Sequence, residues 1–123
     1  MSIRVLIGDP DQELLAVFQT YLSGQGFHVV ATDNEQQCLH QLREFAPDVL
    51  VLELDPARRW GERVVAGMQD RGNSLDVPVI ALTHGSVRTA GESTHEPIRA
   101  SLVKPFSMSE LVENIHEIVA SPA

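Results

Sequence analysis

The stretch Val49-Leu50-Val51-Leu52-Glu53-Leu54 constrains the fold of this chain more than any other part of the sequence. Its first four residues are apolar and two of them are β-branched, which indicates a strand covered on both faces, as in a parallel sheet packed between helices. An acid interrupts the run, and Asp55 and Pro56 end the strand. Because open α/β sheets bind ligands at the carboxyl ends of their strands, we expect the functional site around Glu53.

Strand and helix patterns alternate along the chain. Four further apolar runs have the length of strands: Ile3–Gly8, Phe27–Ala31, Val77–Leu82 and Ile98–Val103. Apolar residues at helical spacing lie between most of them. The alternation predicts an α/β fold, a flavodoxin-like three-layer sandwich with a five-stranded parallel sheet of order 2-1-3-4-5. Only Val87 and Ala90 are apolar between His84 and Pro97, so the fourth helix is predicted to be weak or missing.

Three predicted helices begin with capping signals. Asp9 is predicted to cap the first helix, with Pro10 at the first helical position and Gln12 completing a capping box. The same signal recurs twice further along, in Asn34 with Gln37 and in Ser107 with Glu110. A third helix is predicted from Trp60 to about Asp70.

Composition narrows the class of protein. A chain of 123 residues with 43% apolar residues suits one domain, which we expect to span residues 1–123 without an output domain. The net charge of −8 argues against nonspecific nucleic-acid binding and favours a protein partner or a cation. The single cysteine, Cys38, excludes an internal disulfide and is predicted to be a core residue. Without a membrane-length apolar run or a secretory signal, we expect a cytoplasmic protein.

The predicted topology brings four polar residues together. In the order 2-1-3-4-5, the ends of the first, third, fourth and fifth strands surround one switch point. The residues at these ends are Asp9, Glu53, Thr83 and Lys104. We therefore expect them to form the site.

These positions, together with Lys104-Pro105-Phe106, resemble the receiver domain of two-component response regulators, a CheY-like domain. The resemblance runs the length of the chain, and Gly61 lies where that family has a glycine. It implies that an aspartate at the position of Glu53 accepts a phosphoryl group from a phosphohistidine. It also implies that two acids after the first strand and a backbone carbonyl hold Mg²⁺, while the hydroxyl of Thr83 and Lys104 balance and read the phosphate.

The sequence departs from this pattern at several of these positions. Glu53 stands in the phosphoacceptor position, and Pro10 replaces the second acid, so the metal site keeps Asp9 and the carbonyl of Asp55. Mg²⁺ binding is therefore expected to be weak or absent. Ser101 stands in place of the switching aromatic, and His84 follows Thr83 where the family keeps a small residue. Together these changes favour a degenerate receiver.

Several residues have two interpretations. Glu53 either forms an ion pair with Lys104, which we favour, or is an ordinary acid at a strand end. Asp9 is either a helix cap alone or part of the site, and the hydroxyl of Thr83 is either functional or merely structural. Asp55 is a less favoured alternative phosphoacceptor. The cluster Arg58-Arg59-Trp60 has two interpretations: it docks a partner, or, as we favour, Trp60 packs on the third helix. The five histidines lack the spacing of a zinc site.

Three functions compete. The favoured hypothesis is a non-enzymatic receiver that acts as an interaction module in phosphorelay-type signalling, with aspartyl phosphorylation lost. Its partners would be a histidine kinase, a phosphotransfer protein, an output protein or a second copy of the domain. The alternative is a working receiver with Mg²⁺-dependent phosphoryl transfer at Glu53 or Asp55. A flavodoxin-like binder of a small molecule is least favoured, because the loop Gly8–Asp11 is acidic and ill-suited to cradle a phosphate.

Overall fold

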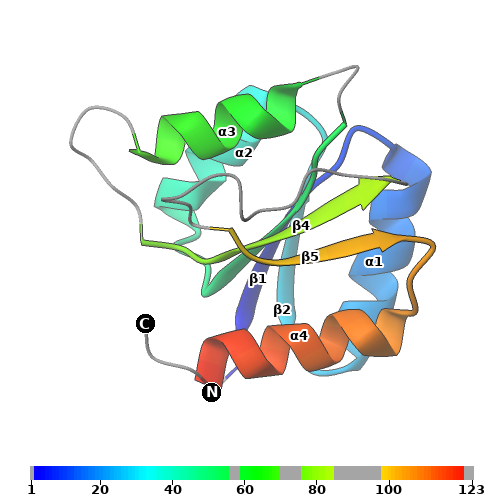
Figure 1. Cartoon of the computed structure of the whole chain (residues 1–123). Coiled ribbons are helices and arrows are strands. Elements are labelled where there is room, and N and C mark those ends of the chain that lie inside the picture. The colour runs from blue at the N-terminus through cyan, green and yellow to red at the C-terminus, as the bar shows by residue number, and fades with distance from the viewer. Residues whose placement is uncertain (1, 56–58, 70–75, 85–97, 121–123) are drawn as a thin grey trace.

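Five parallel strands form a single sheet of order β2-β1-β3-β4-β5, as predicted (Figure 1). The computed structural model describes residues 2–55, 59–69, 76–84 and 98–120. Its elements are β1 Arg4–Gly8, α1 Gln12–Gly24, β2 His28–Thr32, α2 Glu35–Glu44, β3 Val49–Glu53, α3 Trp60–Gln69, β4 Val79–His84, β5 Ile98–Lys104 and α4 Met108–Ala120. The polar stretch in which a weak or missing fourth helix was predicted, residues 85–97, lies outside the described residues.

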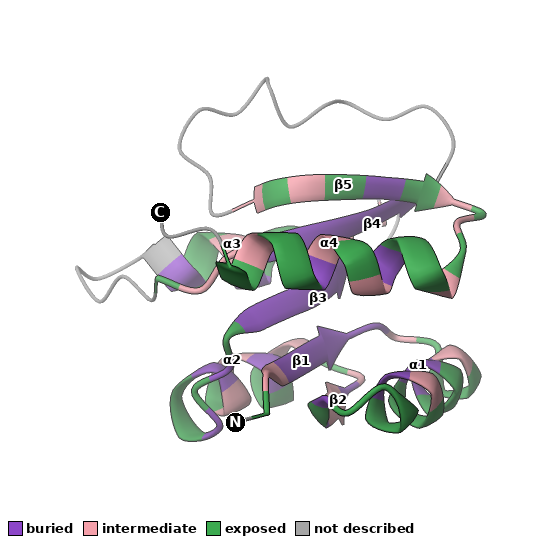
Figure 2. Ribbon diagram, turned by 90° about the horizontal axis from the view of Figure 1, so that it is seen from below, coloured by how far each residue is buried: buried purple, intermediate pink, exposed green. Residues whose placement is uncertain are grey.

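The helices cover the two faces of the sheet and so form the three predicted layers. α1 and α4 pack on one face, and α2 and α3 pack on the other (Figures 1 and 2). The central strand β3 is buried along its whole length. Val49 and Val51 belong to the core under α1 and α4, whereas Leu50 and Leu52 belong to the core under α2 and α3. Burial on both faces thus explains the apolar run Val49-Leu50-Val51-Leu52.

Three strands begin later than predicted, and the first of them is β1, which starts at Arg4 and not at Ile3. The N–H of Phe27 donates to the carbonyl of Leu22 at 3.2 Å and so closes the end of α1, and β2 starts at His28. Gly26, with φ of 97°, makes the turn, because residues with side chains rarely adopt positive φ. β4 starts at Val79, directly after Pro78, which has no N–H to give to a neighbouring strand.

Two of the three predicted caps are confirmed. The side chain of Asn34 accepts a hydrogen bond from the N–H of Gln37 at 2.9 Å, and Ser107 Oγ accepts one from the N–H of Glu110 at 3.0 Å. Within the described residues, no helix is long and apolar enough to cross a membrane.

Candidate functional site

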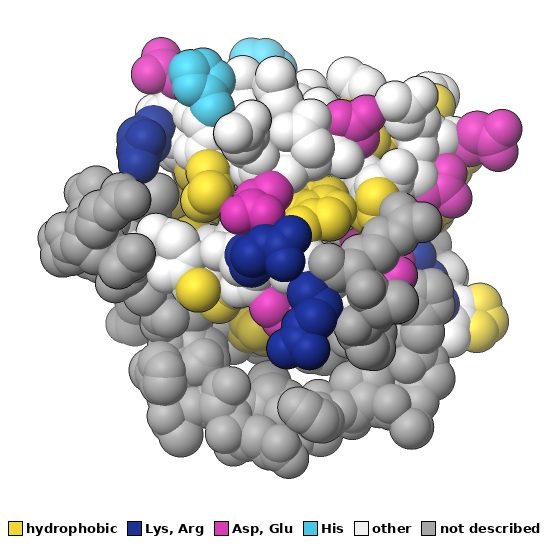
Figure 3. All heavy atoms as spheres, turned by 90° about the horizontal axis from the view of Figure 1, so that it is seen from above, with side chains coloured by type: hydrophobic (Ala, Val, Ile, Leu, Met, Phe, Trp, Pro, Cys, Tyr) yellow, Lys and Arg dark blue, Asp and Glu magenta, His cyan; other side chains and the backbone are white. Residues whose placement is uncertain are grey.

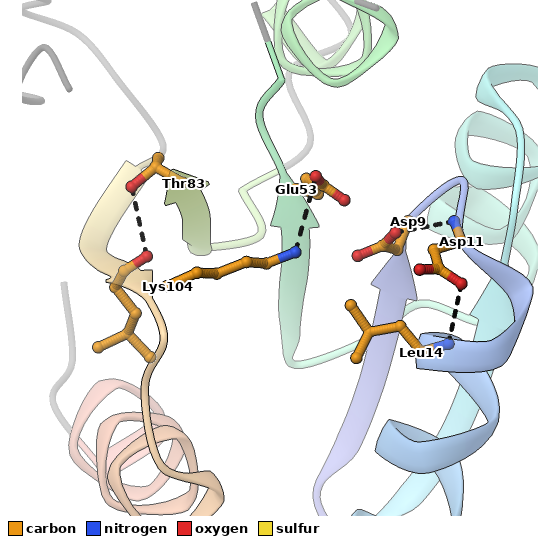
Figure 4. Close-up of polar contacts among 7 residues, drawn as sticks. Asp9, Asp11, Leu14, Glu53, Thr83 and Lys104 are labelled. Carbon is orange, nitrogen blue, oxygen red and sulfur yellow. Dashed lines mark hydrogen bonds and ion pairs between the residues drawn. The ribbon is translucent and has the colours of Figure 1, made fainter. Parts of the chain in front are cut away.

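The carboxyl edge of the sheet brings the predicted residues together. Asp9 follows β1, Glu53 ends β3, Thr83 lies near the end of β4, and Lys104 ends β5. The parallel register pairs Gly8 with Leu52 and Glu53 with Leu82, so the strands end at the same level. Figure 4 shows the Glu53 carboxylate between the Lys104 ammonium and Asp9.

Glu53 and Lys104 form the predicted ion pair. Lys104 Nζ lies 3.7 Å from Glu53 Oε2, and the side chains of Lys104 and Glu53 are 22% and 6% exposed. Lys104 is also the only lysine in the sequence. A charge so far removed from water requires an opposite charge nearby, and the ammonium of Lys104 supplies one. The interpretation of Glu53 as an ordinary water-facing acid is therefore wrong.

Asp9 is a buried member of the site and does not cap α1, so its predicted role as a helix cap is wrong. The N–H of Asp9 donates to the carbonyl of Thr32 at 3.1 Å, which keeps this residue in line with the sheet. The cap is Asp11, whose Oδ1 accepts hydrogen bonds from the N–H groups of Glu13 at 3.0 Å and Leu14 at 3.2 Å. The acid of the capping signal therefore lies two residues later than predicted, and Asp9 is left facing Glu53.

The carboxyl group of Asp9 has an unusual protonation equilibrium. Its Oδ1 accepts a hydrogen bond from the N–H of Asp11 at 2.9 Å, whereas its buried Oδ2 receives none from the described residues. The pKa of Asp9 is raised from 3.8 to about 7, first because burial disfavours the charged form, and then because of a side-chain hydrogen bond to Glu53 and the negative charge of that residue. A protonated carboxyl group can donate a hydrogen bond to a neighbouring carboxylate. Asp9 and Glu53 therefore form a carboxyl–carboxylate pair near neutral pH.

Thr83 is buried, and its Oγ1 donates to the carbonyl of Leu102 at 3.3 Å. This hydrogen bond joins β4 to β5 and satisfies the hydroxyl with backbone. Thr83 thus has a structural contact, and a role of its hydroxyl in reading a bound phosphate stays a prediction.

The model of the response regulator receiver domain family matches residues 5–116. The chain belongs to this family. Its sequence is 31% identical over 122 residues to the transcriptional regulatory protein PrrA of Mycobacterium tuberculosis, covering 96% of this chain and 50% of that protein. The chain thus spans about half the length of this curated relative.

Solved structures agree on the receiver fold. The crystal structure of FixJ-N superimposes with a TM-score of 0.84 at 21% identity, covering 100% of this chain and 98% of that one. A response regulator receiver domain protein from Clostridium thermocellum gives a TM-score of 0.82 at 19% identity, with coverages of 96% and 94%. At these identities the likeness shows the fold alone.

The metal site that the receiver family implies does not fit this receiver. Asp9 and Asp55 were the predicted ligands, yet no three His, Cys, Asp or Glu side chains among the described residues are placed to hold a metal ion together. The carbonyl of Asp55 accepts a hydrogen bond from the N–H of Arg59 at 3.0 Å. Mg²⁺ requires an octahedral set of oxygen ligands with one or two carboxylates, and Lys104 already places a positive charge beside Glu53.

Two close packing contacts around the site were not found from the sequence. A Cβ at Gly61 would overlap the carbonyl oxygen of Glu53 and lie 3.0 Å from Leu54 Cδ2, so the first turn of α3 packs directly on the backbone of Glu53. A Cβ at Gly8 would lie 2.9 Å from Leu52 Cδ1 and 3.2 Å from Trp60 Cη2. A glycine within the first turn of a helix, where it costs stability, is the signal that could have pointed to Gly61.

Trp60 is buried in the core between α2, α3 and the sheet, with 9% of its surface exposed. This burial confirms the interpretation that Trp60 packs on the third helix, and it argues against Trp60 as a docking residue. Arg59 is exposed, and Arg58 lies outside the described residues. Nearby, Arg63 Nε contacts Glu35 Oε1 at 2.7 Å and links α3 to α2. On the face over these helices, acidic and basic side chains lie side by side (Figure 3).

Proposed function

We propose that this receiver domain acts as a protein-interaction module in two-component signalling, with Glu53 in the phosphoacceptor position and aspartyl phosphorylation lost. The observation that carries the proposal is the 3.7 Å contact between Glu53 and Lys104. In the receiver family, the equivalent lysine is implied to neutralise a phosphoryl group on the phosphoacceptor. Here, it neutralises a permanent carboxylate.

The chemistry of Glu53 argues against phosphoryl transfer. Its additional methylene displaces the carboxylate by about 1 Å relative to an aspartate, and such a displacement costs roughly a hundredfold in a positioned reaction. In addition, one side of the carboxylate faces Lys104, and Asp9 forms a hydrogen bond to it. A nucleophile engaged by two neighbours has to break these contacts before it attacks phosphorus.

A permanent charge at this position changes how the domain is controlled. An acyl phosphate hydrolyses, whereas a glutamate side chain does not. Whether this receiver engages a partner would then depend on the concentrations of the receiver and of its partners, and not on phosphorylation. We propose a histidine kinase, a phosphotransfer protein, an output protein or a second copy as the partner, in the cytoplasm. Because the relative from M. tuberculosis is a transcriptional regulatory protein, an output partner or segment that controls transcription belongs to the proposal.

Intact-protein mass spectrometry after incubation with acetyl phosphate and Mg²⁺ tests the loss of phosphorylation. We expect no added phosphate on the native chain, under conditions that label a receiver domain with an aspartate phosphoacceptor. A phosphate adduct that disappears in Glu53→Gln would instead identify a working receiver at Glu53. An adduct that persists in Glu53→Gln but is lost in Asp55→Asn would place the reaction at Asp55, and either adduct overturns the proposal.

A further inference from the structure

We infer that the carboxyl edge of this sheet binds no divalent cation, because Pro10 replaces one of the acids that would ligate it and Lys104 already places a positive charge beside Glu53. This inference rests on the proposed function, since it uses the same correspondence between this chain and the receiver family. It concerns a separate property, the dependence of the site on Mg²⁺. A site that needs no metal would leave the interaction surface of this domain insensitive to Mg²⁺.

Two of the remaining oxygen donors are already hydrogen bonded, Oδ1 of Asp9 and the carbonyl of Asp55. Oδ1 of Asp9 accepts a hydrogen bond from the N–H of Asp11 at 2.9 Å. The buried Oδ2 of Asp9 receives no hydrogen bond from the described residues, and the carboxyl group lies beside Glu53 (Figure 4). The carbonyl of Asp55 accepts a hydrogen bond from the N–H of Arg59 at 3.0 Å. A cation would have to compete with each of these contacts.

One of the acids that the site would need is missing. Pro10 stands where the second carboxylate is implied, and it offers neither a side-chain oxygen nor an N–H. The next residue, Asp11, does not substitute for it, because its Oδ1 is bound to the N–H groups of Glu13 and Leu14 at the start of α1 (Figure 4). Turning this carboxylate toward Asp9 would remove the cap of the helix.

The charge of Lys104 also disfavours a cation at this edge. Lys104 Nζ lies 3.7 Å from Glu53 Oε2, so a fixed positive charge already neutralises the carboxylate that would attract a cation. Mg²⁺ gives up its water ligands reluctantly and binds proteins through one or two carboxylates. Here one carboxylate is neutralised, one is buried against it, and a third is absent. The longer side chain of Glu53 and the replacement of an acid by Pro10 therefore both disfavour the binding of a divalent cation.

Mn²⁺ provides the probe, because its unpaired electrons broaden the NMR signals of nearby amides. The experiment compares the native chain with Pro10→Asp, which supplies the missing acid, and with Pro10→Ala, which changes the backbone without adding a charge. In the native chain and in Pro10→Ala, we expect no broadening at Asp9, Asp11 or Glu53 that excess Mg²⁺ reverses. In Pro10→Asp, we expect such broadening, with an apparent affinity at least tenfold tighter than in Pro10→Ala.

Two results would overturn the inference. One is broadening in the native chain that Mg²⁺ reverses and that Glu53→Gln abolishes, a comparison that does not depend on whether Pro10→Asp folds. The other is equal behaviour of folded Pro10→Asp and Pro10→Ala, which would show that the missing acid is not the cause. Neither result decides the proposed function, because that proposal fails only if the native chain takes up phosphate.

Discussion

Replacing Lys104 by methionine tests the central contact of the site, because methionine keeps most of the aliphatic stem and removes the charge. Two unit charges 3.7 Å apart attract each other by about 4.5 kcal/mol at an effective dielectric constant of about 20. Desolvation of the nearly buried Glu53 offsets part of this attraction, and Lys104 retains some contact with water. We therefore expect Lys104→Met to lower the free energy of unfolding by about 2 kcal/mol.

Urea unfolding of the native chain, Lys104→Met, Glu53→Gln and the double variant measures this coupling. In the Glu53→Gln background the lysine no longer neutralises a buried charge, so Lys104→Met should then cost less than about 0.5 kcal/mol. Arg99 is an exposed cation on the same strand, and Arg99→Met serves as the control with an expected effect below about 0.5 kcal/mol. A coupling free energy near zero would refute the conclusion that Glu53 depends on Lys104.

Three further predictions follow from the surroundings of the site. Because the folded-state pKa of Asp9 is raised to about 7, its protonated form stabilises the fold fully below a pH of about 4, and this contribution is lost as the pH rises through about 7. Urea unfolding as a function of pH should show this decline in the native chain and not in Asp9→Asn; equal profiles would contradict it. Gly61→Ala should lower the free energy of unfolding by about 2 kcal/mol, because its Cβ overlaps the Glu53 carbonyl. Gly24→Ala, with open space at its Cβ, should not lower it, and equal melting temperatures of the two variants would be inconsistent with the close contact. Burial raises the pKa of the Cys38 thiol to about 11, so a thiol reagent at pH 8 should react slowly with the native protein and promptly in denaturant; prompt reaction of the native protein would show that the thiol is accessible.

The sheet could be predicted from the sequence because its signals are local. The apolar run ending at Glu53 marks a strand buried on both faces, and the alternation of strands with helices leaves few topologies. Once the order of strands is predicted, the meeting of Glu53 with Lys104 follows, because both residues end strands at the same edge. The contact observed between them confirms this prediction.

The start of α1 could not be predicted correctly, because two acids compete for one role. Asp9 and Asp11 are both suitable caps and stand on either side of Pro10. The outcome depends on a hydrogen bond to a different part of the chain, from the N–H of Asp9 to the carbonyl of Thr32. Tertiary structure keeps Asp9 with the sheet and leaves Asp11 to begin the helix.

The raised pKa of Asp9 was also beyond sequence reasoning. It arises from burial and from contact with Glu53, and both depend on the distance between two strand ends. The approach of Gly61 to the carbonyl of Glu53 is of the same kind, since it depends on the angle at which α3 returns to the sheet. A sequence pattern predicts which residues end strands, but not how closely their neighbours pack.

The absence of a side chain at Gly8 makes room for three side chains from other elements. The indole edge and Leu52 occupy the space that a methyl group on residue 8 would need, with Cys38 Sγ also only 3.3 Å from it. A larger residue at position 8 is therefore expected to be accepted only where Leu52 and Trp60 both give way. A redesign of position 8 therefore has to change its neighbours in the same step.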